Sequence, residues 1–323
     1  MNPFPPLAML AALCVTAASA AEPAYPDRPV RVLVPFPPGG ANDIVARQIG
    51  QRLNARWGKP VVIDNRGGAG GNIGTEIGAR ANPDGYTLLI GSTSTLASNM
   101  SLYEKLPFDV VRDFAPIALI VTAPNMLCAT VGVPAKTVPE LIKLAKTAPQ
   151  KLNYSSFGEG SSSHLIAEMF KRQGGIDMVH VPYKGGALAL AAVIGGEVHM
   201  TFSNFSVALP QVKSGKVRGV AVTSLKRAAA LPEVPTVAES GLPGFEATAW
   251  VALVAPRATP RAIVQRVNAD IRAELSDKDM RAQLAAQGLE PAGGTPEALG
   301  QHIRAEIERW RRVIREAGVR AQN

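Results

Sequence analysis

The sequence predicts an α/β fold of two lobes, each built on a mostly parallel sheet flanked by helices. Two observations support this prediction. Short apolar strands alternate with glycine- or serine-rich loops and helices, which is the order of the βα units in parallel sheets. These units fall into two clusters, about residues 25–122 and 125–222, which together are too long for one compact sheet. We therefore assign residues 21–122 and 225–323 to lobe 1 and residues 123–224 to lobe 2.

The first cluster begins with an apolar strand that runs into a proline- and glycine-rich loop and then a helix. Apolar residues recur in this helix at helical spacing, from Ile44 to Trp57, and Gly58 ends it. A second glycine-rich loop and an Asn-Pro-Asp-Gly turn separate the elements that follow. We expect strands at 30–34, 61–63 and 86–90, a helix at 72–81, a turn at 82–85 and a polar loop at 91–99.

The second cluster repeats this arrangement. Thr137 and Glu140 form a capping box for a helix through Leu144. The remaining elements follow from the same alternation of apolar strands, small-residue loops and helices. We expect strands at 152–156, 178–181, 198–202 and 217–222, and helices at 164–173, 187–194 and 207–213.

The C-terminal part is expected to be mostly helical, without strands of its own, and to pack back on the first cluster. Thr259-Pro260 opens one helix. Ser276 and Asp279 cap the next, which Gly288 ends. Thr295-Pro296 opens the last helix, and Gly318 lies past its end.

The N-terminal segment predicts export. Residues 7–18 form an apolar run that is too short to span a bilayer, and Ala18-Ser19-Ala20 follows with small residues at the positions that a signal peptidase requires. A buried N-terminal helix is the alternative, which the prolines on both sides of the run disfavour. We expect residues 1–20 to be a cleaved signal peptide and the mature protein to be periplasmic. Cys128 would then be the only cysteine, so an intrachain disulfide is excluded.

The net charge of +8 does not by itself indicate a nucleic-acid partner. The densest basic cluster, between Arg304 and Arg315, is interleaved with Glu306 and Glu308. Aromatic residues make up 5% of the chain, too few for a base-stacking platform. We expect a solvated basic surface that helps to collect anions and no nucleic-acid binding.

Loops rich in glycine or serine carry the functional prediction. Each follows a strand and opens a helix, at 36–43, 65–72, 157–164 and 182–187. In open α/β sheets ligands bind at the carboxyl ends of the strands, where helix N-termini offer free N–H groups and a partial positive charge. Glycines that only make tight turns are the alternative for any one loop. Their recurrence at equivalent positions favours an anion site between the lobes.

The sequence lacks the motifs of the two alternative functions, nucleotide binding and hydrolysis. The segment from Gly68 fails the G-x-G-x-x-G spacing because Ile73 stands at the third glycine, and the sequence contains no G-x-x-x-x-G-K-[ST] and no G-x-S-x-G. His164 lies next to serines, where it is either a ligand contact or a structural or capping residue. His180 and His199 alternate with apolar residues on strands, so we interpret them as packed or solvent-facing side chains. We therefore expect no catalytic residue, no metal site and no cofactor.

Several segments together resemble one family. Residues 35–43, which read PFPPGGAND, are similar to the P-[FW]-x-x-G-G-x-x-D loop of the tripartite tricarboxylate transporter receptors, also called Bug solute-binding proteins. Residues 65–71 resemble their N-R-x-G-A-G-G segment, and residues 83–88 their P-D-G-Y-T-L turn. Residues 154–165 and 180–186 resemble their second-lobe motifs. The order and spacing of these segments cover nearly the whole mature chain.

The resemblance implies a type II periplasmic-binding-protein fold, a monomer that closes on a small mono-, di- or tricarboxylate in the cleft between the lobes. The partners would be the membrane subunits of a tripartite tricarboxylate-type transporter, or alternatively a periplasmic sensor. Arg66 is either structural or a contact. The implied ligand-binding residues are Phe36, Pro38, Gly39, Gly40, Asp43, Ala69, Gly70, Gly71, Ser92 and Thr93 in lobe 1, and Ser156, Gly158, Ser161, Ser162, His164, Tyr183, Gly185, Ser203 and Asn204 in lobe 2.

One departure from the family pattern bears on selectivity. Family members often carry an aspartate in the segment that here reads Thr-Phe-Ser-Asn at 201–204. An acidic side chain there would suit a ligand with an ammonium group. Its absence favours a carboxylate without an amine.

Overall fold

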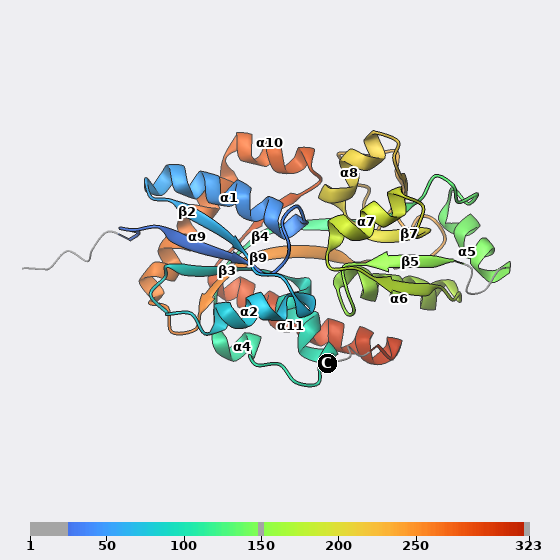
Figure 1. Ribbon diagram of the computed structural model, residues 1–323. Coiled ribbons are helices and arrows are strands. Elements are labelled where there is room, and N and C mark those ends of the chain that lie inside the picture. The colour runs from blue at the N-terminus through green and yellow to red at the C-terminus, as the bar shows by residue number, and fades with distance from the viewer. Residues whose placement is uncertain (1–24, 148–151, 320–323) are drawn as a thin grey trace, which may run out of the picture.

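The computed structural model describes residues 25–147 and 152–319, so the predicted signal peptide lies outside the described residues. Figure 1 shows two α/β lobes side by side, with the N-terminal strands and several C-terminal helices in the left lobe and the green and yellow middle of the chain in the right lobe. Within the described residues, no helix is both long enough and apolar enough to cross a membrane.

The strands of lobe 1 combine parallel and antiparallel pairs. β1 lies between β2 and β3 and is parallel to both, whereas β9 joins β3 and β4 by antiparallel pairing. β10 pairs with β4 outside this order. The bounds are β1 (Val30–Val34), β2 (Val61–Asn65), β3 (Thr87–Ser92), β4 (Phe114–Ala129), β9 (Thr248–Pro256) and β10 (Glu290–Gly293).

The strand β4 continues into lobe 2. Its first part, to Pro124, pairs with β9, and its last part, from Asn125, pairs with β7 and β8. β5 is parallel to both β6 and β7, as the βα units predicted. The bounds are β5 (Asn153–Ser156), β6 (Val179–Pro182), β7 (Met200–Asn204) and β8 (Arg218–Val222).

The long strands β4 and β9 correct two predictions. Each lobe contains a mixed sheet rather than a mostly parallel one, because β4 and β9 run antiparallel to their neighbours. The C-terminal part is not without strands, since it contributes β9 and β10. The parallel βα units of both lobes are nevertheless where the sequence places them.

The helices agree with most of the predicted signals. Gly58 and Gly318 end α1 and α11 in the left-handed conformation, and the Thr295 hydroxyl caps α11. Asp277, rather than Ser276, caps α10, and the expected polar loop at 91–99 is largely helical. The bounds are α1 (Ala41–Trp57), η1 (Ala69–Gly71), α2 (Asn72–Ala79), η2 (Ser94–Ser98), α3 (Asn99–Leu102), α4 (Val110–Asp113), α5 (Val138–Thr147), α6 (Ser162–Gly174), α7 (Gly186–Ile194), α8 (Phe205–Lys213), α9 (Arg261–Ser276), α10 (Lys278–Ala286) and α11 (Pro296–Ala317).

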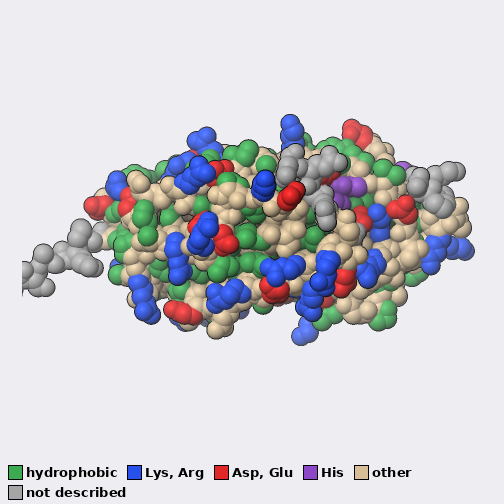
Figure 2. Space-filling view, turned by 90° about the horizontal axis from the view of Figure 1, so that it is seen from below, with side chains coloured by type: hydrophobic (Ala, Val, Ile, Leu, Met, Phe, Trp, Pro, Cys, Tyr) green, Lys and Arg blue, Asp and Glu red, His purple; other side chains and the backbone are tan. Residues whose placement is uncertain are grey.

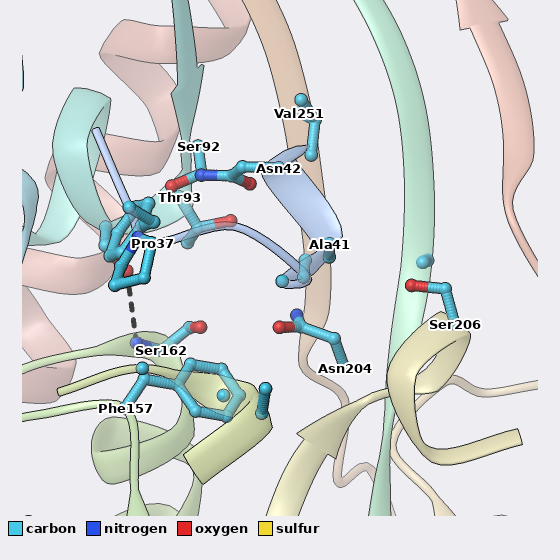
Figure 3. Close-up of a pocket in the computed structure, with 18 of the residues that line it drawn as sticks. Pro37, Ala41, Asn42, Ser92, Thr93, Phe157, Ser162, Asn204, Ser206 and Val251 are labelled. Atoms are coloured by element: carbon cyan, nitrogen blue, oxygen red, sulfur yellow. Dashed lines mark hydrogen bonds between the residues drawn. The ribbon is translucent and has the colours of Figure 1, made fainter. Parts of the chain in front are cut away.

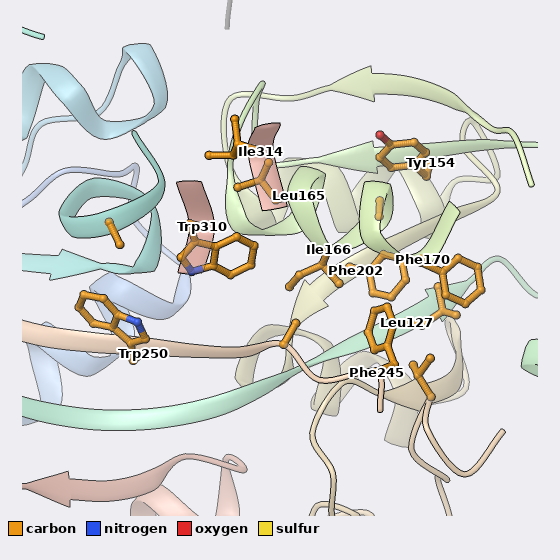
Figure 4. Packing of buried hydrophobic residues seen from close by; sticks show 14 of the residues in the cluster. Leu127, Tyr154, Leu165, Ile166, Phe170, Phe202, Phe245, Trp250, Trp310 and Ile314 are labelled. Atoms are coloured by element: carbon orange, nitrogen blue, oxygen red, sulfur yellow. The ribbon is translucent and has the colours of Figure 1, made fainter. Parts of the chain in front are cut away.

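One hydrophobic cluster extends through both lobes. Figure 4 shows it running from Trp250 and Trp310 in lobe 1 to Phe170 and Phe202 in lobe 2. The indole N–H groups of both tryptophans donate to one oxygen of the buried Glu306 carboxylate, at 2.9 and 3.0 Å. Helix α11 is thereby fixed to β9 and also packs against α6 of the other lobe.

The segment between β8 and β9 contacts lobe 2, although the sequence assigned it to lobe 1. The N–H of Ala247 donates to Thr223 at 2.9 Å, and the ring of Phe245 packs against Phe170. Leu231 and Val234 join the core of α7 and α8. We therefore propose that the second crossing between lobes lies near residue 247 rather than at 224.

Charged side chains are dispersed over the face of the molecule shown in Figure 2. On the face seen in Figure 2, Lys and Arg side chains are scattered, with Asp and Glu side chains between many of them. The arginines of α11 illustrate this mixing, since Arg309 and Arg311 each pair with a glutamate three residues earlier. This distribution is that of a solvated surface rather than of a continuous basic band.

Candidate functional site

A cavity of about 280 Å³ lies where the two lobes meet. This volume is just below the range of about 300–1,000 Å³ typical of ligand pockets, so the cavity fits a small molecule. Figure 3 shows Pro37, Asn42 and Thr93 on one side and Ser162 and Asn204 on the other. The lining residues are Phe36, Pro37, Pro38, Gly40, Ala41, Asn42, Ser92, Thr93, Ser94, Val121, Ala123, Ala249, Trp250, Val251 and Leu289, together with Phe157, Ser162, Lys184, Gly185, Gly186, Ala187, Leu188, Asn204 and Ser206.

Helices α1, α7 and α8 all begin at this cavity. Their N-cap residues are Gly40, Gly185 and Asn204, and within the described residues no side chain caps any of these helices. The first N–H groups of each helix therefore remain available, with the positive end of the helix dipole behind them. Helix α6 differs, because the Ser161 hydroxyl caps it and the Ser162 N–H donates to Ser94 Oγ at 3.3 Å.

The buried Asp43 shapes the loop that leads into α1. Its carboxylate accepts hydrogen bonds from the Gly39 N–H, from Asn65 Nδ2 and from Arg47 Nε, at 2.9–3.0 Å. Burial by itself raises the pKa of Asp43, but these three donors outweigh it and the pKa lies below its ordinary value. Asp43 thus stays ionised and holds the backbone of Gly39 in place, which presents Gly40 and Ala41 to the cavity.

The lobes touch around the cavity. A Cβ placed on Gly185 would lie 3.7 Å from the ring of Pro37 in the opposite lobe. On another side, the Ser98 hydroxyl donates to the carbonyl of Gly160 at 3.5 Å. The structure therefore shows the lobes in contact across the cleft.

The structure brings part of the predicted site to the cavity wall. Most of these residues come from the β1–α1 loop and from the ends of β3 and β7. They are Phe36, Pro38, Gly40, Ser92, Thr93, Ser162, Gly185 and Asn204.

The 65–72 loop does not line the cavity. Asn99 Nδ2 donates to the carbonyl of Gly70 at 3.1 Å, and a Cβ on Gly70 would lie 2.6 Å from the Tyr103 hydroxyl oxygen. A Cβ on Gly71 would lie 3.1 Å from the ring of Phe36, so Gly71 packs behind a residue of the wall, and Ala69 does not line the cavity either. The side chain of Arg66 pairs with Asp64 at 2.9 Å, which favours the structural interpretation of Arg66.

Several of the predicted lobe 2 residues that do not line the cavity form a polar network. Ser156 Oγ and His180 Nε2 are hydrogen-bonded at 2.6 Å, and the ring of His180 stacks on His164 with 3.9 Å between centroids. The N–H of Gly160 donates to His164 Nδ1 at 2.9 Å. Gly158, Ser161, Tyr183 and Ser203 also lie off the cavity wall, as do Gly39 and Asp43 in lobe 1.

The histidine pair is kept neutral by its surroundings. Burial lowers the pKa of His164 to about 4, and burial together with the neighbouring His164 lowers that of His180 to about 4. Neutral stacked rings avoid placing two positive charges side by side. This arrangement supports the structural interpretation of His164.

Sequence reasoning missed several polar residues of the wall, notably Asn42, Ser94, Lys184 and Ser206. Asn42 follows the glycine loop directly, so its position in the first turn of α1 was a usable signal. Lys184 is exposed at the edge of the cavity and is the one charged side chain on the wall as far as the chain is described. Among the described residues, no group of three or more His, Cys, Asp or Glu side chains is placed to hold a metal ion.

The model of the tripartite tricarboxylate transporter family receptors matches residues 45–319. The chain belongs to this family. The family resemblance drawn from the motifs is thereby confirmed, and the receptors of this family are periplasmic solute-binding proteins.

Solved structures agree in fold. The structure of Rpa4515 from R. palustris with adipate is similar with a TM-score of 0.90 and 39% identity, covering 92% of this chain and 99% of that one. The periplasmic binding protein BugD gives a TM-score of 0.87 and 35% identity, covering 92% and 100% of the two chains. MatC from Rhodopseudomonas palustris with bound malate gives 0.85 and 35%, covering 90% and 100%. The two-lobed α/β fold of the binding proteins is thus confirmed for this receptor.

Proposed function

We propose that this receptor captures a small organic acid in the cavity between its lobes and delivers it to the membrane subunits of a tripartite tricarboxylate-type transporter. The observation that carries the proposal is the meeting of uncapped helix N-termini from both lobes at one cavity. The ligands of Rpa4515 and MatC, adipate and malate, support it because both are carboxylates. Membership of the family of tripartite tricarboxylate transporter receptors supports delivery to a transporter.

One carboxylate of the ligand would bind where α1 and α7 approach each other. Pro37, at the start of the α1 loop, and Gly185, the N-cap of α7, both line the cavity and lie so close that a Cβ on Gly185 would be 3.7 Å from the Pro37 ring, so the two N-termini face the same end of the cavity. A helix N-terminus contributes about 0.3–2 kcal/mol toward an anion, and a hydrogen bond to a charged group about 1.5–3 kcal/mol. A few such contacts support micromolar affinity, about −8 kcal/mol, after the entropy of ordering is subtracted.

Closure follows from this arrangement. A ligand shifts a conformational equilibrium only by its difference in affinity for the two states. The N–H groups of α1 belong to lobe 1 and those of α7 to lobe 2, so only the closed state offers both sets to one carboxylate. Ligand binding would therefore favour the state in which the lobes touch.

The proposal is tested by removing one N–H group. Ala41 is the first residue of α1, and Gly40 before it has an extended conformation (φ −83°, ψ 170°), which is compatible with a following proline. Ala41→Pro should therefore keep the helix and delete one donor to the carboxylate. We expect calorimetry with adipate and malate to show about 10-fold weaker binding or more, the effect of losing one hydrogen bond to a charged group.

Lys278→Pro is the matched control, because it changes the first residue of α10, which does not line the cavity. It should leave binding unchanged. Aspartate should bind more weakly than malate, since the 201–204 segment carries no acidic side chain. Normal binding by Ala41→Pro, or no binding of any carboxylate by the unaltered protein, would contradict the proposal.

A further inference from the structure

The corner of the cavity at α8 contains a buried hydroxyl group without a partner. Ser206 is 7% exposed and lines the cavity, and its Oγ has no hydrogen-bond partner among the described residues. Figure 3 shows this oxygen directed into the open space beside Asn204. Buried polar atoms in folded proteins are nearly always hydrogen-bonded, so an unsatisfied hydroxyl on a cavity wall indicates a group that binds there.

Further donors surround Ser206. It is the second residue of α8, whose N-terminus is uncapped within the described chain, so backbone N–H groups point to the same corner. The amide of Asn204 also lines the cavity and makes only a long contact, 3.5 Å, with Asn125 Oδ1. Asn125 Nδ2 is itself buried and unpartnered among the described residues. The corner therefore offers several hydrogen-bond donors without a short partner in the described chain, namely the Ser206 hydroxyl, the Asn204 amide and the first N–H groups of α8.

The charge of this corner determines which kind of ligand group can bind there. Its donors are neutral, the dipole of α8 adds positive potential, and none of the residues that line the cavity in the described chain is acidic. An acceptor, and best a carboxylate, would satisfy these donors. An ammonium group could donate to the Ser206 and Asn204 oxygens, but it would find no carboxylate on the described wall to neutralise its charge and would face the positive end of the α8 dipole, so it is disfavoured.

The remaining wall is apolar. Val121, Ala123, Val251 and Leu289 line it, and Phe36 and Phe157 add aromatic surface. A hydrocarbon chain can be buried against such a wall, whereas hydroxyl groups along the chain would lose their hydrogen bonds to water.

We propose that Ser206 and the N-terminus of α8 form a second subsite, which binds the distal carboxylate of an unbranched α,ω-dicarboxylate whose methylene chain lies on the apolar wall. This inference rests on the proposed function, in which the first carboxylate binds at α1 and α7. Ser206 then determines which chain end the receptor accepts, and monocarboxylates of the same length lack the group that it binds.

The test compares adipate with hexanoate, which has the same number of carbon atoms and only one carboxylate. The unaltered receptor should bind adipate about 10- to 100-fold more tightly, the range expected for one hydrogen bond to a charged group. Ser206→Ala should lower adipate affinity about 10-fold or more and leave hexanoate affinity unchanged. Its thermal midpoint without ligand should not fall, because the hydroxyl has no partner to lose.

Ser101→Ala is the matched control, since Ser101 Oγ is also buried and unpartnered among the described residues but does not line the cavity. It should change neither affinity. Equal binding of adipate and hexanoate, or unchanged adipate binding by Ser206→Ala, would overturn the second subsite and leave the first intact. Failure of both ligands to bind the unaltered receptor would instead overturn the proposed function, and the subsite with it.

Discussion

The contact between Gly160 and Leu102 offers a direct test of lobe closure. Gly160 lies in the loop before α6 in lobe 2, with φ +67°, and Leu102 ends α3 in lobe 1 with 2% of its surface exposed. A Cβ on Gly160 would lie 2.5 Å from Leu102 Cγ and 2.8 Å from Cδ1, and would overlap Cδ2. Gly160→Ala should therefore act as a wedge between the lobes.

Two separate free-energy costs determine the effect of Gly160→Ala on stability and on adipate affinity. An alanine in the left-handed region costs about 1–2 kcal/mol, and this cost applies whether the lobes are open or closed. The overlap with Leu102 exists only when the lobes touch, and an extra methyl group in a packed contact costs about 1–3 kcal/mol. Only the second cost weakens ligand binding, so the dissociation constant for adipate should rise about 5- to 150-fold.

Calorimetry with adipate, combined with thermal unfolding, separates the two costs. Gly175→Ala is the matched control: Gly175 has φ +59°, and no heavy atom of the described chain beyond its neighbours would lie within 4 Å of a new Cβ. It should lower the unfolding temperature but leave affinity unchanged. Leu102→Ala in the Gly160→Ala background should restore binding by removing the overlapping side chain. The reasoning is refuted if Gly160→Ala binds like the control, or if it loses stability far beyond the control with no loss of affinity.

Two further predictions concern acid stability and processing. Because the pKa values of His164 and His180 are about 4 in the folded protein and about 6.5 when unfolded, the unfolded chain binds more protons between these values. The free energy of unfolding should therefore fall as the pH is lowered from about 6.5 to about 4, by up to about 3 kcal/mol for each histidine. In urea unfolding, the His180→Phe variant should show a smaller fall in this free energy over the same pH range. A fall equal to that of the unaltered protein would contradict this explanation. Intact-mass measurement of periplasmic protein should show a mature chain beginning at Ala21 or Glu22, and retention of Met1 would contradict export.

The parallel βα units could be predicted because their signals are local. Each apolar strand, its glycine-rich loop and its amphipathic helix are contiguous, and Gly58 marks the end of α1 by itself. The strand β4 could not be recognised in this way. Pro116 and Pro124 interrupt it, and prolines argue against a strand in sequence reasoning, although here Pro116 lies beside a register shift in the pairing with β9. Its partner β9 is more than a hundred residues away, so nothing local signals the pairing.

The residues of the cavity wall could be predicted only in part, because here too contacts between distant parts of the chain leave no local signal in the sequence. The loops at 36–43 and 65–72 look alike in sequence, since both follow a strand with glycines and open a helix. Only tertiary packing distinguishes them, because Tyr103 and Asn99 lie against Gly70 while the other loop faces the opposite lobe. Ser206 carries no motif, and its significance depends on burial without a partner.

The neutral character of the wall has a consequence for release. A buried carboxylate paired with a buried lysine or arginine would require two charges to lose their hydration, and removal of one partner would leave the other buried alone. Here the donors are backbone N–H groups, hydroxyls and amides, and Lys184 lies exposed at the edge, where it can attract an anion without being desolvated. In the proposed complex, separation of the lobes lets water replace each of these neutral contacts, and α1 and α7 then no longer share the ligand. This arrangement suits the delivery to a membrane transporter proposed above, because opening the lobes is sufficient to weaken every contact with the ligand at once.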